Sequence, residues 1–300
     1  MNNEATASWL QLTLTAIEHS PEQLEDALLA AGALSVTLQA AGDQPLWEPA
    51  PGETPLWSQT QVSGLFEAQT DFQAVQQVLR RVLDSTTLTG YHLEALVERD
   101  WTRAWLEDFH PMCFGKRLWV SPTEQAPPDD PQAVTLRLDP GLAFGTGTHP
   151  TTALCLEWLD EAHLTGQTVV DYGCGSGILA IAAAKLGASR VWGIDIDPQA
   201  LLASKCNAEG NHIKDRIVLG TPEHLSIPPV DMLLANILAA PLIRLAPRFS
   251  SLVKNRGRLI LSGILEVQAA AVQQAFMPWF AFEPSWHRED WVLLQAVRKE

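Results

Sequence analysis

Apolar and polar positions are spaced differently in the two parts of this 300-residue chain. In the first hundred residues, short alternating runs such as Trp9–Ile17 predict half-buried strands, and two longer stretches have helical spacing. Ser20–Gln23 has the pattern of a helix start with a capping serine, and Thr70 or Asp71 caps the second helix. The order strand–helix–strand, strand–helix–strand predicts a small ferredoxin-like α+β domain over residues 1–98.

From residue 167 onward, continuous apolar runs alternate with helical stretches. Such runs are typical of a parallel sheet that is buried on both faces. The predicted strands are Thr168–Tyr172, Arg190–Asp195, Ile217–Leu219, Val230–Asn236 and Arg258–Ile264. Two further runs, His287–Asp290 and Trp291–Val297, predict an antiparallel hairpin. We therefore predict an α/β domain over residues 121–300, preceded by a linker helix and connecting segment at 99–120.

The composition indicates the cellular compartment of the protein and argues against metal sites and disulfide bonds. The four cysteines have no paired C-x-x-C spacing, so they predict neither a metal site nor a disulfide framework: Cys113, Cys155, Cys174 and Cys206. The longest apolar run, Ile178–Ala184, is too short to span a membrane. No basic residue precedes Arg80, so we expect no secretory leader. The sequence predicts a soluble cytoplasmic protein without metal.

Charge is distributed unevenly along the chain. Residues 1–100 carry 14 acidic and 3 basic side chains, whereas residues 101–300 carry 21 acidic and 17 basic ones. An acidic first third repels nucleic acid, whose binding needs Lys and Arg against the phosphates. The same charge attracts a basic partner and speeds the encounter with it. The residues alone leave open a second interpretation, in which the acidic surplus only aids solubility.

A glycine-rich turn carries the most specific chemistry. The apolar strand Val169–Tyr172 runs into Gly173-Cys174-Gly175-Ser176-Gly177, and the next strand ends in Asp195. Glycines at such a turn allow close approach of a ligand to the backbone, and the following helix start favours electron-rich groups. An acidic residue about twenty positions on can accept hydrogen bonds from ribose hydroxyls. The pattern predicts an adenosine-containing cofactor; the alternative is a glycine-rich turn without a ligand.

Glycine spacing indicates which cofactor this is. Dinucleotide sites have the spacing G-x-G-x-x-G, which this turn lacks. The absence of that spacing disfavours a nicotinamide-dependent oxidoreductase. Here the pattern is G-x-G-x-G preceded by Asp171, which is familiar from class I methyltransferases that bind S-adenosylmethionine. Asp171, Gly173, Gly175 and Asp195 are therefore candidate cofactor-binding residues.

A second glycine-rich segment, Asp139–Thr152, precedes the cofactor strand. It contains no G-K-[ST] sequence and no lysine, so it is not a triphosphate loop. It suits a lid over the cofactor, with Phe144 against an apolar part of the ligand and a threonine hydroxyl against a polar one. The alternative is a bend in which Thr151 or Thr152 caps a helix at Ala153–Leu159.

A polar residue, Asn236, ends the strand Val230–Asn236, where ligands bind in open α/β sheets. Its side-chain carbonyl can accept a hydrogen bond from a substrate amine and so aim the nitrogen lone pair at a methyl group. The alternative is that Asn236 caps the helix beginning near Leu238. His149, before a proline, is more typical of a hydrogen-bonding scaffold than of a proton shuttle.

Together these segments resemble the family of ribosomal protein L11 methyltransferases (PrmA). The resemblance covers most of the chain and is carried by Trp101, Phe109–Pro111, Phe114–Trp119, Asp139–Thr152, Asp171–Gly177, Gly193–Asp197 and Ala235–Leu238. It implies a Rossmann-like class I methyltransferase domain with a seven-stranded, mostly parallel sheet. It also implies that the acidic first domain recognises L11, a basic protein, and brings its lysine side chains and amino terminus to the active site.

The resemblance further implies which residues contact S-adenosylmethionine. These are Thr152, Gly173, Asp195 and Asn236, with Asn236 as the catalytic residue and with Phe144, Gly145 and His149 lining the same pocket. We expect a monomer that has no metal, no membrane partner and no direct recognition of nucleic acid. Nucleic-acid methyltransferases carry Asn-Pro-Pro-Tyr where this chain has Asn-Ile-Leu. Two alternatives remain: another basic protein as substrate, and a non-catalytic module that binds S-adenosylmethionine.

Overall fold

The computed structural model describes residues 7–17, 19–42, 57, 59–84, 91–97, 110–123, 125, 130–138 and 147–300. The chain divides into two compact units, residues 1–100 and residues 101–300. The predicted linker helix at 101–109 lies outside the described residues, as do Phe144 and Gly145. No helix in the described ranges is long and apolar enough to cross a membrane.

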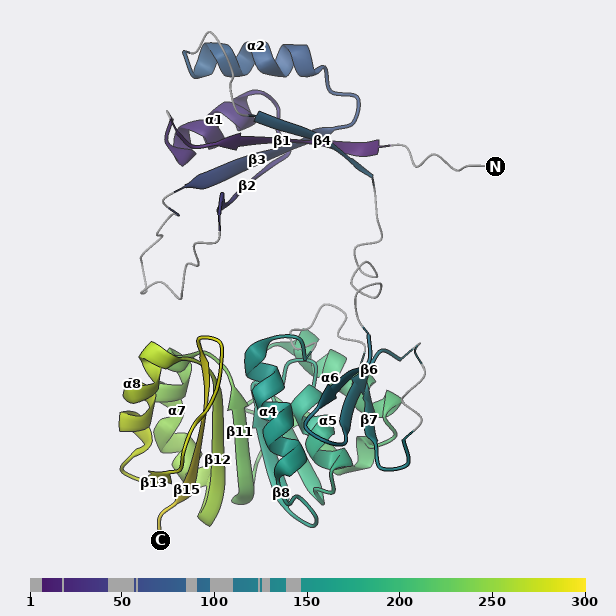
Figure 1. Ribbon diagram of the computed structural model, residues 1–300, viewed down its shortest axis with the longest axis vertical. Helices are drawn as coiled ribbons and strands as arrows, with labels where there is room; N and C mark the ends of the chain where they lie inside the picture. The colour runs from purple at the N-terminus through teal and green to yellow at the C-terminus, as the bar shows by residue number, and fades with distance from the viewer. Residues whose placement is uncertain are drawn as a thin grey trace. The chain divides into compact units, whose positions relative to one another are not determined.

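In its described residues, the first unit is a four-stranded antiparallel sheet with two helices. Its strands, in the order β2-β3-β1-β4, are β1 (Ala7–Thr15), β2 (Ser35–Ala40), β3 (Thr60–Glu67) and β4 (Tyr91–Val97). The helices are α1 (Pro21–Ala30) and α2 (Phe72–Val82), and both lie on the same side of the sheet (Figure 1). Their apolar faces form one core with the strands, including Leu12, Leu28, Val62 and Leu79. The predicted strands and helices of this unit are therefore present.

Local capping starts both helices where the sequence predicts. Ser20 Oγ accepts from the amide of Gln23, whose side-chain oxygen accepts in return from the Ser20 amide at 2.9 Å. This reciprocal pair satisfies two amides that otherwise lack partners at a helix start. Asp71, and not Thr70, caps α2, because its carboxylate accepts from the amide of Gln73 at 2.9 Å.

The second unit has a main sheet of eight strands in the described residues, with the order β10-β9-β8-β11-β12-β15-β13 and with β14 paired to β15. Their bounds are β8 (Thr168–Tyr172), β9 (Arg190–Ile194), β10 (Ile217–Gly220), β11 (Val230–Asn236), β12 (Val253–Leu265), β13 (Phe280–Phe282), β14 (Trp286–Arg288) and β15 (Trp291–Arg298). The first five strands of that order are parallel to one another. β15 is antiparallel to β12, and β13 and β14 are each antiparallel to β15. The expected count of seven strands is wrong because two short strands, β13 and β14, share the outer edge of β15.

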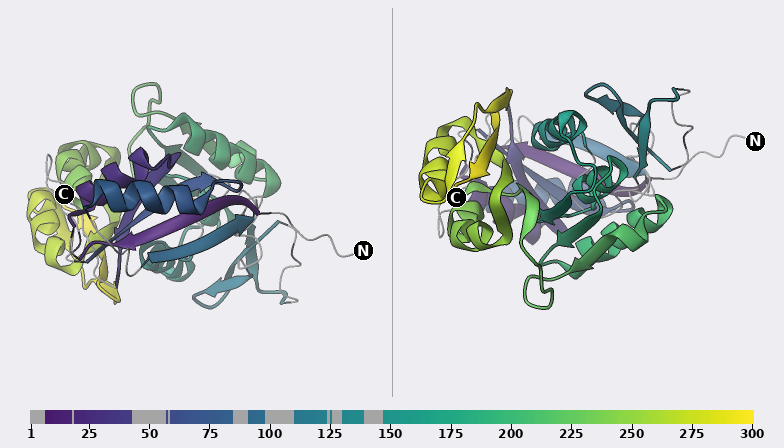
Figure 2. Two further views of the ribbon diagram at one scale, coloured as in Figure 1. Left: turned by 90° about the horizontal axis from the view of Figure 1, so that it is seen from above. Right: turned by 90° about the horizontal axis from the view of Figure 1, so that it is seen from below.

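Within the described residues, five helices cover this sheet. On one face lie α4 (Pro150–Glu161), α5 (Ile178–Lys185) and α6 (Pro198–Gly210); on the other lie α7 (Ala239–Leu252) and α8 (Glu266–Phe276). A short 3₁₀ turn, η1 (Lys214–Arg216), leads into β10. Figures 1 and 2 show α7 beside α8, away from α4 and α5. Buried strands such as β8 and β11 are apolar on both faces, as the continuous runs predict.

A small sheet of β5 (Met112–Phe114), β6 (Leu118–Ser121) and β7 (Val134–Arg137) belongs to the second unit and was not predicted from the sequence. Phe114, Leu118 and Leu136 are buried in the same core as α4 and α5. The unit therefore extends to the N-terminal side of residue 121. Strands of three or four residues are too short to show a clear alternation.

The turn between β5 and β6 docks on Asp160 of α4. The buried Asp160 carboxylate accepts from the amides of Lys116 and Arg117 at 2.6 and 3.3 Å, and from Arg117 Nε at 3.2 Å. Gly115 has φ +72°, and a Cβ there would lie 2.5 Å from the Asp160 carboxylate. The Gly-Lys-Arg sequence thus forms the binding site for the buried Asp160 carboxylate.

Replacing this carboxylate should destabilise the second unit. Asp160→Ala leaves two backbone amides without their acceptor and removes a buried ion-pair partner, which costs about 3 kcal/mol. Glu157→Ala on the same helix is the matched control, because the Glu157–Arg288 pair is more exposed and is worth less than about 1 kcal/mol. Calorimetric melting of the two variants measures the difference, and equal melting temperatures would contradict this assignment.

Candidate functional site

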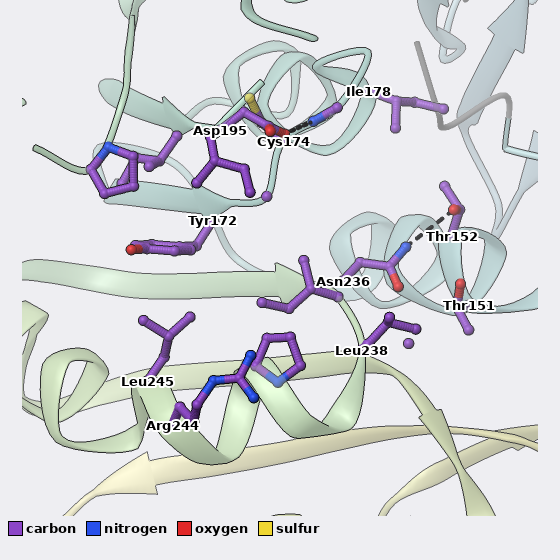
Figure 3. A pocket seen from close by; sticks show the side chains of 18 of the residues that line it. Thr151, Thr152, Tyr172, Cys174, Ile178, Asp195, Asn236, Leu238, Arg244 and Leu245 are labelled. Carbon is purple, nitrogen blue, oxygen red and sulfur yellow. Dashed lines mark hydrogen bonds between the residues drawn. The ribbon is translucent and has the colours of Figure 1, made fainter. Parts of the chain in front are cut away.

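A cavity of about 880 Å³ lies at the carboxyl ends of β8, β9 and β11, where parallel strands of an open sheet present their ligands (Figure 3). It brings together the glycine turn, the end of β9, the start of α4 and the start of α7. Six of the predicted site residues line it: His149, Thr152, Gly173, Gly175, Asp195 and Asn236. Its remaining wall is mostly apolar and includes Ile178, Ile196, Leu238, Leu245 and Trp291.

The glycine turn after β8 has the backbone conformation that its sequence predicts. Gly173, Gly175 and Gly177 all have positive φ, at +82°, +53° and +82°. The amides of Gly173 and Cys174 both donate to the carbonyl of Ile194, at 2.7 and 2.9 Å, which joins the turn to the end of β9. A Cβ on Gly173 would collide with the side chain of Ile237. Only glycine therefore fits at this position of the cavity wall.

Asp195 is held in a fixed orientation at the cavity by two backbone amides. Its Oδ2 accepts from the amide of Gly175 at 2.9 Å, and its Oδ1 accepts from the amide of Asp197 at 3.0 Å. Each carboxylate oxygen keeps a second acceptor site, because an ionised carboxylate has about four in total. The side chain can thus receive two more donors from a ligand without moving.

Asp171 does not line the cavity, although the sequence made it a candidate cofactor-binding residue. It is 1% exposed behind the glycine turn, and its Oδ2 accepts from the amide of Ala180 in the first turn of α5 at 2.9 Å. Within the described residues, its Oδ1 has no hydrogen-bond partner. Burial raises the pKa of Asp171 to about 7, against the Ala180 hydrogen bond, which lowers it. Its position is that of a support for the turn and for α5.

The raised pKa of Asp171 predicts a pH-dependent stability. The folded protein holds this proton more tightly than the unfolded chain, so the contribution is complete below the ordinary pKa of 3.8 and is lost as pH rises through about 7. Asp171→Asn removes the titration. The free energy of unfolding of the variant relative to the unsubstituted chain should therefore rise between pH 4 and 7, by up to about 4 kcal/mol. Urea unfolding across this range measures it, and a pH-independent difference would contradict a buried, titrating Asp171.

His149, and not a threonine, caps α4, so the expectation that Thr151 or Thr152 caps this helix is wrong. The helix also begins earlier than expected, at Pro150. His149 Nδ1 accepts from the Thr151 amide at 3.3 Å and lies 2.7 Å from Thr151 Oγ1. Its ring packs edge-on against Trp291 with a centroid separation of 4.9 Å. Burial lowers the pKa of His149, and the charge of Glu289 opposes this effect. The lowered pKa favours the neutral ring. Because Nδ1 accepts from the Thr151 amide, the proton of the neutral ring is on Nε2.

Asn236 and Thr152 meet at the centre of the site (Figure 3). The Asn236 Nδ2 donates to Thr152 Oγ1 at 3.2 Å, from the end of β11 to the first turn of α4. Asn236 does not cap α7, because that helix begins at Ala239 with Leu238 in the cap position and no side-chain capping bond. This bond uses one of the two Nδ2 hydrogens, so the Asn236 carbonyl oxygen and the second Nδ2 hydrogen remain for a ligand in the cavity.

Sequence reasoning missed several lining residues. Arg244 and Arg248 come from α7, and Arg248 Nη2 donates to the carbonyl of Pro222 at 2.9 Å. The Arg248 guanidinium also lies 5.9 Å from the centre of the Tyr172 ring. The rule that ligands bind at strand ends could have found Tyr172, which ends β8, and Pro222, which follows β10. Nothing in the local pattern of β15 marks Trp291 as a cavity residue.

The described residues of the site do not form a group of metal ligands. Among the residues that the structure describes, no three His, Cys, Asp or Glu side chains gather to hold an ion. The Cys155 thiol is buried, and burial raises its pKa to about 12. It is therefore neutral at physiological pH and unsuited to bind a metal or to act as a nucleophile.

Comparisons with known proteins agree with this geometry. The family model described as ribosomal protein L11 methyltransferase (PrmA) matches residues 8–299. A protein of that name from Methylococcus capsulatus is 53% identical over 292 residues, which cover 97% of this chain and 99% of the relative. Another, from Actinobacillus pleuropneumoniae serotype 5b, is 50% identical over 298 residues, which cover 97% of this chain and all of the relative.

A solved structure is also similar. The ribosomal protein L11 methylase from Lactobacillus delbrueckii subsp. bulgaricus superposes with a TM-score of 0.59 at 35% sequence identity. The match covers 64% of this chain and the whole of that one. The second unit therefore has the α/β methyltransferase fold. From the family match over nearly its full length, the chain belongs to the ribosomal protein L11 methyltransferase (PrmA) family.

Proposed function

We propose that this chain is a protein methyltransferase that transfers methyl groups from S-adenosylmethionine to lysine side-chain amines of ribosomal protein L11. The family match supports the reaction and the substrate. The observation that carries the proposal is that one cavity of about 880 Å³ is lined by Asn236, Thr152 and Asp195. A volume of this order suits a small-molecule cofactor together with the end of a substrate side chain.

The cavity fits S-adenosylmethionine by the chemistry of its walls. The oriented Asp195 carboxylate offers acceptor sites for the two ribose hydroxyls. Ile196, which is 80% exposed, and Leu245 offer apolar surface for a flat base. Gly173 leaves room for close approach of the ligand to the backbone, and Gly175 lies beside it. When bound, S-adenosylmethionine supplies a methyl group on a positively charged sulfur, and the residues of this chain hold and orient the amine that receives it.

Asn236 orients the acceptor amine. The Asn236 Nδ2 is anchored by Thr152, and the Asn236 carbonyl oxygen can accept one N–H of the amine in the cavity that this residue lines. This contact turns the nitrogen lone pair away from Asn236 and toward the methyl group. Most of the rate should come from this positioning, since well-aligned reacting groups gain about 7–11 kcal/mol in favourable cases.

The amine must lose a proton before it can react. A lysine side chain has a reference pKa of about 10.4 and is almost fully protonated at neutral pH. An apolar cavity lowers that pKa, because burial disfavours the charged form. Leu238, Ile237 and Trp291 provide such surroundings. His149 does not suit the role of general base, since its Nδ1 is engaged by Thr151 and its Nε2 carries the proton. The proton therefore leaves to water.

The first unit recognises the protein substrate. Its charge is strongly acidic, and Glu22 and Asp26 stand exposed on α1. Such a surface attracts a basic ribosomal protein and repels the phosphates of RNA. Its helix order and its strand order β2-β3-β1-β4 support our proposal that it is a ferredoxin-like domain. In this proposal the enzyme acts as a monomer in the cytoplasm.

A comparison of acceptors tests the proposed function. The chain is incubated with methyl-labelled S-adenosylmethionine and, separately, with purified L11, with ribosomal RNA and with an unrelated basic protein. Transfer to L11 alone supports the proposal. Transfer to the unrelated protein would favour the alternative of a different basic substrate. Cofactor binding without transfer to any acceptor would leave only a non-catalytic binding module.

A further inference from the structure

Ser262 and Gly263 interrupt the regular pairing of β12 beside the reaction site. The pairing of β12 with β15 is regular up to Leu261 and resumes, in a shifted register, at Ile264. Gly263 has φ +80°, which is the left-handed conformation that glycine accepts readily. On the other side of β12, Ser262 is the last residue paired with β11, and its partner is Asn236. This bulge therefore lies directly beside the residue that we assign to the amine.

Ser262 ties the start of α4 to this end of the sheet. Its side chain is fully buried, and its Oγ donates to the carbonyl oxygen of Thr151 at 3.2 Å. The next residue, Thr152, accepts the hydrogen bond from Asn236. Thr151, Thr152 and Asn236 lie close together in the cavity wall (Figure 3). The Ser262 hydroxyl thus holds the helix turn that in turn holds Asn236.

Gly263 leaves room for the chain that follows Asn236. A Cβ at this position would lie 2.5, 2.8 and 3.0 Å from the O, C and N atoms of Ile237. These are backbone atoms, which cannot rotate away as a flexible side chain does. Ile237 is also confined by Gly173, because its side chain lies where a Cβ of Gly173 would be. The path of the chain out of β11 is therefore set between two glycines, and with it the direction of Asn236.

We propose that the Ser262–Gly263 bulge is a positioning device for methyl transfer: Ser262 acts through Thr152, and Gly263 acts through Ile237, to hold Asn236 in its reactive orientation. The inference rests on the proposed function of Asn236. It assigns a role to two residues. Gly263 lines the cavity, and Ser262 is buried and does not line it. Small displacements matter here, because a misplacement of about 1 Å can cost a factor of about 100 in rate.

Ser262→Ala removes only the hydroxyl. We expect kcat for methylation of L11 to fall about tenfold, while the Kd for S-adenosylmethionine and the melting temperature stay close to those of the unsubstituted chain. Ser250→Ala is the matched control, because Ser250 is also buried and its hydroxyl donates to a carbonyl, that of Pro247 on α7, away from the cavity. The control should leave kcat unchanged.

A double-mutant cycle separates positioning from a general structural effect. Since Ser262 acts through Thr152, Ser262→Ala should lower kcat by less than about twofold in a Thr152→Val background, where the contact to Asn236 is already lost. Gly263→Ala should lower kcat in either background. Independent, multiplicative effects of Ser262→Ala and Thr152→Val, or an unchanged kcat for Ser262→Ala alone, would overturn the inference. Absence of transfer by the unsubstituted chain would instead overturn the proposed function, and this inference with it.

Discussion

Asn236→Ala should lower kcat for methylation of L11 by about 100- to 1000-fold, the range found when one preorganised polar contact is removed from an active site. The variant loses the carbonyl that accepts from the amine and the amide that bonds to Thr152 at 3.2 Å. The Kd for S-adenosylmethionine should change by less than about tenfold, since Asp195 and the glycine turn remain. Steady-state kinetics with separate cofactor titration measures both.

The matched control is Asn211→Ala. Asn211 is also buried and uses both ends of its side chain, accepting from the Arg137 amide at 2.9 Å and donating to the Asn207 carbonyl at 2.8 Å, but it does not line the cavity. Its removal should lower stability and leave kcat unchanged. If Asn236→Ala retained more than a tenth of the activity, orientation of the amine by Asn236 would be wrong.

Asp195→Ala should weaken binding of S-adenosylmethionine by about 100-fold. Hydrogen bonds to a charged group contribute about 1.5–3 kcal/mol each, and about 1.4 kcal/mol corresponds to a factor of ten in affinity. Loss of the carboxylate also releases the amides of Gly175 and Asp197, so the glycine turn loses its support. Asp195→Asn keeps one acceptor oxygen and should lie between the two. Calorimetric titration gives the affinities.

Asp197→Ala separates the cofactor contact from helix capping. Asp197 lies two residues on and caps α6 by accepting from the amide of Gln199 at 2.8 Å, but it does not line the cavity. Its removal should cost about 1 kcal/mol of stability with little effect on affinity. If Asp197→Ala weakened cofactor binding as much as Asp195→Ala, the effect would come from the loop and not from the carboxylate.

The parts of the site that depend on short stretches of chain could be predicted from the sequence. Strands β8 and β11 begin and end where the apolar runs predict, and the glycine turn has the positive φ values that its spacing requires. The position of Asp195 could also be predicted, because the sequence indicates both the end of β9 and the start of α6. These features are fixed by neighbouring residues, so a local pattern is sufficient to find them.

The other parts depend on contacts between distant segments. Trp291 and Arg248 reach the cavity from β15 and α7, and their positions follow from the packing of the sheet and not from their own neighbours. Asp171 lies beside the turn in sequence but behind it in space, where it supports α5. His149 caps α4 in place of a threonine, because the helix begins at Pro150 and so includes both threonines, and His149 Nδ1 accepts from the Thr151 amide at 3.3 Å. Local propensity does not distinguish these alternatives.

The most direct test of the account is to locate the methyl groups on L11. Purified L11 is incubated with the unsubstituted chain and S-adenosylmethionine, digested, and mapped by mass spectrometry, with the Asn236→Ala variant as the paired reaction. We expect methylated lysine side chains on L11 in the first reaction and almost none in the second. Unmodified L11 in both reactions, with S-adenosylmethionine bound to the unsubstituted chain, would contradict it.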